Sequence, residues 1–164
     1  MNLTLFAKLV NDKCGMVISD GQYDILTKAI NSRMSLIGLH NQNKYYETLL
    51  GDHDETHRLI DLLTINETYF FRENTHYVLL SNRLLPELLN NKKASGEKVR
   101  ILSAGCSSGE EPYSLAMTLV EKYGRDILNS ISIIACDINQ EVLEKARRGI
   151  YGKHSFRGCP DSLR

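Results

Sequence analysis

The fold is decided by Val99-Arg100-Ile101-Leu102-Ser103-Ala104-Gly105-Cys106-Ser107-Ser108-Gly109-Glu110-Glu111-Pro112-Tyr113. Residues 99–104 are mostly apolar and β-prone, so they predict a short strand. Gly105 and Gly109 enclose a turn of small residues, and Pro112 suits the first turn of the helix that follows. The stretch therefore predicts a strand, a glycine turn and a helix in succession.

The chain on either side of this stretch extends the pattern. Residues 131–136 predict a second strand that ends at Asp137, and a further helix is expected from Asn139 onward. Strand, turn, helix, strand, acid and helix form the opening of a doubly wound α/β sheet. Residues 1–64 predict helices only, because none of their segments alternates apolar and polar residues as a half-buried strand would. We expect two domains, residues 1–64 and 65–164.

Composition excludes several classes of protein. The 164 residues carry 20 basic and 20 acidic side chains, so the basic excess typical of a nucleic-acid binder is missing. No apolar run approaches the roughly 20 residues that a membrane helix needs, and residues 1–6 do not predict a secretory signal. The four cysteines are scattered without a C-x-x-C pair, which predicts reduced thiols in a cytoplasmic protein.

The glycine turn is a candidate ligand site. Ligands of open α/β sheets bind outside the carboxyl ends of the strands, where Gly105 and Gly109 leave room. The spacing is G-x-x-x-G, which breaks the dinucleotide fingerprint, and Glu110 and Glu111 at the helix start disfavour a pyrophosphate. A ligand with hydroxyls or a cationic centre fits better. The alternative is a turn with a structural role only.

Asp137 is a second candidate. An acid at the end of the second strand can accept hydrogen bonds from ribose hydroxyls. It lies further from the glycine turn than the usual spacing, and a longer loop over residues 123–129 explains the excess. The alternative role is a helix N-cap, which Asp also favours.

Two further segments contain residues that could have a functional role. Phe70, Phe71 and Arg72 lie in a segment without periodicity, where the simplest interpretation is two aromatic anchors beside a surface charge. His53 and His57 are spaced to share one helical face, but the segment lacks a third metal ligand, so we interpret it as a solvated face and expect no metal.

Three motifs resemble one known family. Residues 101–114 resemble the cofactor-binding motif of the CheR chemotaxis methyltransferases, residues 64–73 resemble their N-x-T-x-F-F-R-E segment, and residues 135–146 resemble their second-strand acid and following helix. The helical leader also looks like their N-terminal domain. The resemblance implies an all-α N-terminal domain followed by the first part of a Rossmann-like α/β (class I) S-adenosylmethionine-dependent methyltransferase domain.

The resemblance also implies an activity. The family transfers a methyl group from S-adenosylmethionine to glutamate side chains of chemoreceptors, leaving a methyl ester and S-adenosylhomocysteine. By position, the cofactor would be contacted by Asn66, Thr68, Arg72, Gly105, Glu111 and Asp137. Arg72 is the implied catalytic residue, beside the acceptor carboxylate. The implied partner is the cytoplasmic domain of a methyl-accepting chemotaxis protein.

Family members continue beyond the segments matched here. A doubly wound sheet needs about six strands, and only two are predicted, so we expect a C-terminally truncated domain whose sheet self-associates. One alternative is a non-catalytic module that binds a receptor or another partner, which methyl transfer to receptor glutamates would exclude. The other is a different nucleotide-binding α/β protein, which binding of NAD without S-adenosylmethionine would support.

Overall fold

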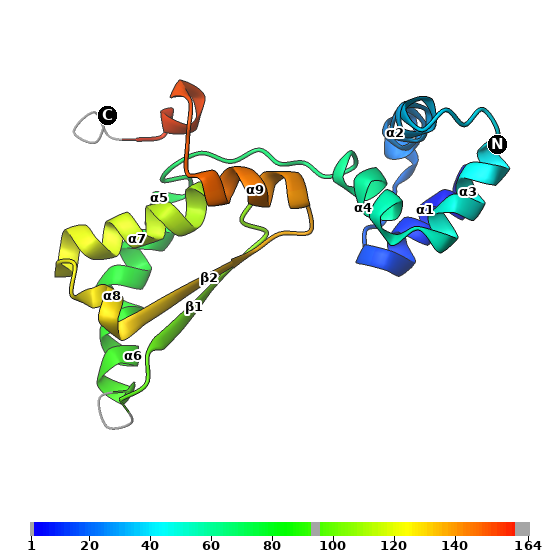
Figure 1. The fold of residues 1–164 in the computed structure, drawn as a ribbon. Coiled ribbons are helices and arrows are strands. Elements are labelled where there is room, and N and C mark those ends of the chain that lie inside the picture. Colours follow the sequence, from blue (N-terminus) through cyan, green and yellow to red (C-terminus); the bar gives the residue numbers. More distant parts are fainter. Residues whose placement is uncertain (1, 93–95, 160–164) are drawn as a thin grey trace. The chain divides into compact units, whose positions relative to one another are not determined.

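The computed structural model describes residues 2–92 and 96–159, and the chain divides into two compact units, residues 1–65 and 66–164 (Figure 1). The first unit contains helices and turns only in its described part. Its elements are α1 (Leu3–Cys14), the 3-10 turn η1 (Asp20–Gln22), α2 (Tyr23–Leu36), α3 (Gln42–Gly51) and α4 (His53–Asp61). The predicted all-α fold of the N-terminal domain is confirmed.

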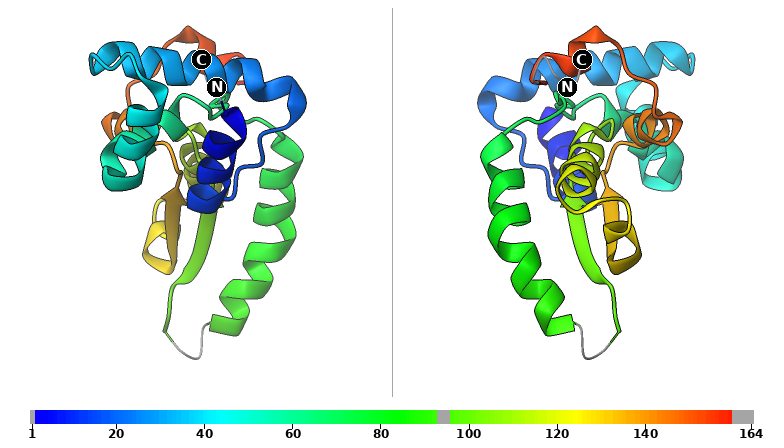
Figure 2. Two further views of the ribbon diagram at one scale, coloured as in Figure 1. Left: turned by 90° about the vertical axis from the view of Figure 1, so that its right-hand side faces the viewer. Right: turned by 90° about the vertical axis from the view of Figure 1, so that its left-hand side faces the viewer.

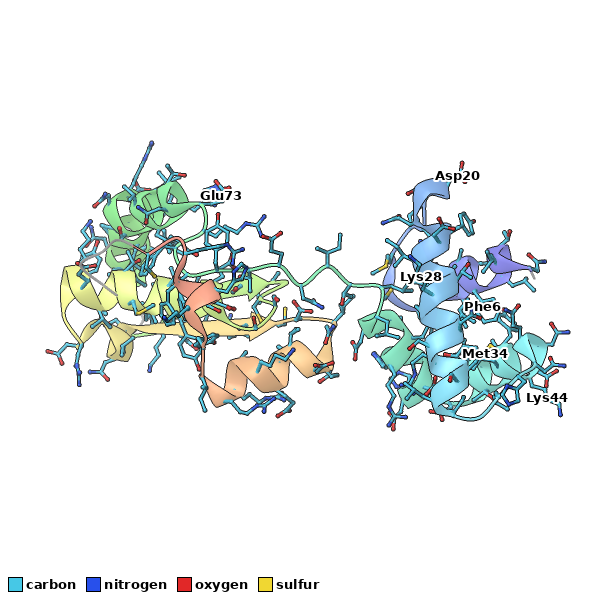
Figure 3. All side chains as sticks on the ribbon, turned by 90° about the horizontal axis from the view of Figure 1, so that it is seen from above. Phe6, Asp20, Lys28, Met34, Lys44 and Glu73 are labelled. Atoms are coloured by element: carbon cyan, nitrogen blue, oxygen red, sulfur yellow. The ribbon has the colours of Figure 1, made fainter. Side chains whose placement is uncertain are left out.

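The helical unit closes around one apolar cluster. Phe6 of α1, Leu26 and Ile30 of α2, Tyr45 of α3 and Leu59 of α4 are all buried in it. Figure 3 labels Phe6 and Met34 among the side chains of this unit. Two of these helices have side-chain N-caps. Asn41 accepts hydrogen bonds from two N–H groups of α3, and Asp52 accepts one from an N–H group of α4.

A buried ion pair corrects the expectation for residues 53–57. Glu55 is 2% exposed, and its carboxylate accepts hydrogen bonds from Arg33 Nε and Nη2 at 2.9 and 2.6 Å and from the Tyr45 hydroxyl at 3.0 Å. Thr56 is equally buried, so only part of this helix faces solvent. The interpretation as a solvated face was wrong for these two residues, because their partners lie on other helices.

After residues 66–73, the second unit continues with one long helical segment, called the rod below. It comprises α5 (Asn74–Leu79), the π-helical turn η2 (Leu80–Leu84) and α6 (Leu85–Lys92), which Figure 2 shows as a continuous green helix. Pro86 is the second residue of α6, just after the π turn, and such a turn can accommodate the missing N–H of a proline within a helix. The helical segment therefore continues through Pro86.

A two-stranded parallel sheet follows the rod. Strands β1 (Val99–Ala104) and β2 (Ile131–Cys136) have the predicted bounds and pair in register from Val99↔Ile131 to Ala104↔Cys136. Between them lie α7 (Glu110–Tyr123) and α8 (Ile127–Ser130), and after them come α9 (Gln140–Arg148) and the 3-10 turn η3 (Lys153–Phe156). Of the segment 123–129 that was expected to be a loop, residues 124–126 form a turn, whereas α8 begins at Ile127.

The two faces of the sheet differ in exposure. Val99 and Ile131 are buried with Leu115 and Leu119 of α7 in the second apolar cluster. On the other face, Leu102 is 64% and Ile134 49% exposed. The expected self-association of the sheet stays a prediction. No helix in the described residues combines the length and apolar character that a membrane span requires.

Candidate functional site

The turn after β1 is tied to the end of β2 by backbone hydrogen bonds. The N–H groups of Gly105 and Cys106 both donate to the carbonyl oxygen of Cys136, at 2.8 and 3.0 Å. The next N–H, that of Ser107, donates to Oδ2 of Asp137 at 2.7 Å. Three successive N–H groups of the turn thus point to the carboxyl end of β2, which fixes the position of both segments.

Asp137 is a bridge between two turns. Its Oδ1 accepts the N–H of Asn139 at 2.9 Å, while its Oδ2 holds Ser107. The N-cap of α9 is Asn139, whose side chain accepts the N–H of Val142 at 3.1 Å. The alternative role of Asp137 as the helix cap was therefore wrong. An ionised carboxylate offers about four acceptor positions, so this half-buried group has capacity for two further donors.

The motif loop, defined here as residues 66–73, is fastened to the same turn. The hydroxyl of Ser107 donates to the carbonyl oxygen of Asn66 at 2.9 Å. Further along, the N–H of Phe71 donates at 2.9 Å to Oγ of Ser114, which is fully buried on α7. Phe71 and Glu73 have φ values of 58° and 56°, a left-handed conformation that non-glycine residues rarely adopt. These contacts hold the loop beside the glycine turn.

The two adjacent glutamates have different surroundings. Glu110 is 2% exposed, and its carboxylate accepts the hydroxyls of Ser108 at 2.7 Å and Ser155 at 2.8 Å. Glu111 is exposed and accepts the hydroxyl of Ser103, at the end of β1, at 2.5 Å. Glu110 is thus part of the packing, whereas Glu111 can also reach a ligand.

The glycines of the turn differ in the same way. A Cβ atom at Gly105 would meet nothing within 4 Å, so the backbone is open on that side. At Gly109, which caps α7 with φ 95°, a Cβ would lie 2.8 Å from the Cβ of Ala146 and 2.9 Å from the Tyr151 hydroxyl. Gly105 leaves space for a ligand, and Gly109 permits close packing of α9.

The remaining candidates lie on the motif loop. Arg72 is exposed, and its Nη1 donates to the carbonyl oxygen of Glu67 at 2.9 Å. Thr68 is half-buried. Hydrogen bonds connect Asn66 through Ser107 to Asp137, and they connect the segment before Arg72 through Ser114 to α7.

Burial and charge keep neighbouring groups protonated. Burial, with the charge of Asp137 next, raises the pKa of the Cys106 thiol. Burial and the carboxylate of Glu111 raise the pKa of the Tyr77 hydroxyl, and burial with Glu110 raises the pKa of Tyr151. These groups are poor bases or nucleophiles near neutral pH.

The spacing of His53 and His57 raises the question of a metal site. Nε2 of His53 lies 3.3 Å from Nε2 of His57, but no group of three or more His, Cys, Asp or Glu side chains in residues 2–92 and 96–159 could hold an ion. All four cysteines are free.

Comparison with known families decides the assignment. Residues 1–64 match the family model described as "CheR methyltransferase, all-alpha domain", and residues 66–164 match "CheR methyltransferase, SAM binding domain". The chain belongs to the CheR methyltransferase family. The two matched regions meet where the structure divides the chain.

Individual CheR relatives agree with this. A chemotaxis protein methyltransferase of Borreliella burgdorferi is 34% identical over 99% of this chain and 59% of its own length. The Escherichia coli chemotaxis protein methyltransferase is 37% identical over 88% of this chain and 48% of its own. A probable biofilm formation methyltransferase, WspC, of Pseudomonas aeruginosa is 35% identical over 93% of this chain and 35% of its own length. The chain spans about half the length of the curated relatives it matches.

Proposed function

We propose that this CheR chain carries the S-adenosylmethionine-binding first part of a methyltransferase that esterifies glutamate side chains of chemoreceptors in the cytoplasm. The observation that supports it best is the bond from the Ser107 N–H to Asp137 Oδ2 beside the open side of Gly105. This geometry leaves a carboxylate with free acceptor capacity next to exposed backbone.

The residues suit the chemical groups of this cofactor. Asp137 has acceptor positions left for the two hydroxyls of a ribose. The exposed carboxylate of Glu111 can pair with an ammonium group of the methionine portion. Asn66 and Thr68 lie on the motif loop, and Asn66 is joined to the turn through Ser107. This donor and acceptor set supports a ligand with hydroxyls and positive charge better than a pyrophosphate.

The reaction requires little proton chemistry from the protein. The reference pKa of a glutamate lies far below 7, so the acceptor is already an anion at neutral pH and needs no general base. S-adenosylmethionine supplies a methyl carbon made electrophilic by the sulfonium. The bond from the acceptor oxygen to that carbon forms as the carbon–sulfur bond breaks, and the electron pair stays on the sulfur of the thioether product.

Arg72 has a positioning task in this scheme. Its guanidinium can orient the acceptor carboxylate through paired hydrogen bonds, so that the oxygen lies in line with the methyl carbon and the sulfur. Very tight pairing would reduce the nucleophilicity of the oxygen, so we assign Arg72 an orienting role. Its exposed position on the motif loop leaves it accessible to an incoming side chain.

A second candidate is a partner-binding module without catalytic activity. The exposed Leu102 and Ile134 on the outer face of the sheet favour it, since such a face can pack against another protein surface. Incubation with methyl-labelled S-adenosylmethionine and a chemoreceptor cytoplasmic fragment separates the two candidates. Label released from the receptor by mild base indicates the methyl ester that we expect, and S-adenosylhomocysteine binding without such label would favour the module.

A further inference from the structure

The return segment, defined here as residues 151–159, packs on the motif loop. The N–H of Phe70 donates to the carbonyl oxygen of Ser155 at 2.8 Å. The Phe70 ring stacks on Phe156 at 4.9 Å between centroids and meets Tyr151 edge-on at 4.8 Å. A Cβ atom at Gly158 would lie 2.6 Å from the Tyr69 ring. The two segments therefore fit closely, although some 80 residues of chain separate them.

Arg157 of the return segment holds two residues of the motif loop. Its Nη2 donates to Oε1 of Glu67 at 2.8 Å, and its guanidinium lies over the Tyr69 ring, 4.1 Å from the centroid. The Arg157 side chain is 28% exposed, so this pair is partly shielded from solvent on the arginine side. An arginine stacks on an aromatic face and forms a directed hydrogen bond at the same time.

Arg72 uses the same two residues. Its Nη1 donates to the main-chain carbonyl of Glu67 at 2.9 Å, and its guanidinium carbon lies 5.9 Å from the centroid of the Tyr69 ring. Two guanidinium groups thus share one glutamate and one tyrosine. Arg157 binds the side-chain carboxylate of Glu67, whereas Arg72 binds the main-chain carbonyl oxygen of Glu67.

We infer that Arg157 is a positioning residue for Arg72. By fixing the Glu67 side chain and the Tyr69 ring, Arg157 fixes the surface on which the Arg72 guanidinium rests. This inference rests on the proposed function, in which Arg72 orients the acceptor carboxylate. Without Arg157, the ring and the carboxylate lose their common partner, and Arg72 samples a wider range of orientations.

Side-chain NMR of the 164-residue chain tests the inference without requiring turnover. The Nε–H resonance of Arg72 reports its surroundings, since the nearby Tyr69 ring shifts it. In Arg157→Gln we expect this resonance to move toward the position of a free arginine. Arg157→Lys, which keeps the charge without the planar fork, should restore it only in part. The matched control is Arg147→Gln on α9, whose partner Glu144 is local and which should leave Arg72 unchanged.

A second variant, at Glu67, tests the same contact in case the Arg157 variant does not fold. Glu67→Ala removes the side chain that Arg157 binds but keeps the backbone carbonyl that Arg72 uses, and it should shift the Arg72 resonance in the same direction. An unmoved Arg72 resonance in folded Arg157→Gln or Glu67→Ala would overturn the inference. So would changes spread over the apolar cluster, because they would indicate a general structural role. Calorimetry of the wild-type chain with S-adenosylhomocysteine tests the proposed function separately, so the failure of either is recognisable.

Discussion

The main-chain N–H of Ser107 lies 2.7 Å from Oδ2 of Asp137, so the turn after the first strand is bonded directly to the acid after the second. The Ser107 hydroxyl continues the chain of contacts to the Asn66 carbonyl. Segments 41 and 30 residues away from Ser107 in the sequence therefore meet at this residue. Its φ of 48° directs the N–H and the hydroxyl to these different partners.

Asp137→Asn should affect both stability and ligand binding. An amide cannot accept from Ser107 and Asn139 with both of its terminal atoms, so one buried N–H loses its partner. We expect a loss of about 1–2 kcal/mol in unfolding free energy, measured by urea denaturation. Asp126→Asn, at an exposed position before α8, is the control and should change little. Equal stability of the two variants would contradict this role of Asp137.

Gly105→Ala and Gly109→Ala should separate ligand space from packing. At Gly109 the added methyl group meets Ala146 and Tyr151, so together with the backbone strain we expect a loss of about 2–4 kcal/mol in stability. At Gly105 only the strain of φ 74° applies, about 1 kcal/mol, but the methyl group fills the open side of the turn. Calorimetry with S-adenosylhomocysteine should show the larger relative loss of affinity in Gly105→Ala. Full affinity in that variant would argue against a ligand at Gly105.

Glu55→Gln should destabilise the helical unit and alter its response to acid. Burial alone would raise the pKa of Glu55, but the hydrogen bonds from Arg33 and Tyr45 outweigh it and lower the pKa below its ordinary value of 4.5. The stability contributed by this carboxylate is therefore present above about pH 4.5 and is lost as the pH falls through the lowered pKa.

Hydrogen exchange of α2 and α4 amides in the whole chain measures this effect. At pH 7 the variant leaves Arg33 without its charged partner, and we expect a loss of about 3 kcal/mol. Below the lowered pKa the two proteins should converge. Glu47→Gln, at an exposed position of α3, serves as the control. A difference that stayed constant down to low pH would show that the charge of Glu55 is not the cause.

Arg72→Ala should lower methyl transfer while leaving most of the cofactor affinity intact. The reason is that orientation of the acceptor contributes to the transition state more than to cofactor binding. Labelled methyl transfer and S-adenosylhomocysteine calorimetry measure the two quantities, with Arg147→Ala as the control. Unchanged transfer in the Arg72 variant would refute the assigned role.

The fold was predictable where local pattern decides it. Both strands have the predicted bounds, because short β-prone runs that end in small or acidic residues are local signals. The π turn before Pro86 has no local sequence signal, so the continuous helix through this proline was not predictable. The loop expectation for residues 123–129 holds only at residues 124–126, because residues 127–130 form α8.

The site was less predictable because its polar groups are paired over long distances. The two adjacent glutamates differ mainly through distant residues: Ser155 of the C-terminal segment bonds to buried Glu110, whereas Ser103 of β1 bonds to exposed Glu111. Ser107 and Ser114 were not predicted as site residues, although they bind the motif loop to the turn and to α7. Their one sequence signal is a small hydroxyl residue next to a glycine turn or within a helix, which is common elsewhere.

Calorimetric titration of S-adenosylhomocysteine into the 164-residue chain, with NAD and the Asp137→Ala variant as controls, tests the central claim most directly. The account predicts specific binding of S-adenosylhomocysteine, none of NAD, and loss of binding in Asp137→Ala. Binding of NAD in place of S-adenosylhomocysteine, or unaltered S-adenosylhomocysteine affinity in Asp137→Ala, would contradict a cofactor site built on Gly105 and Asp137.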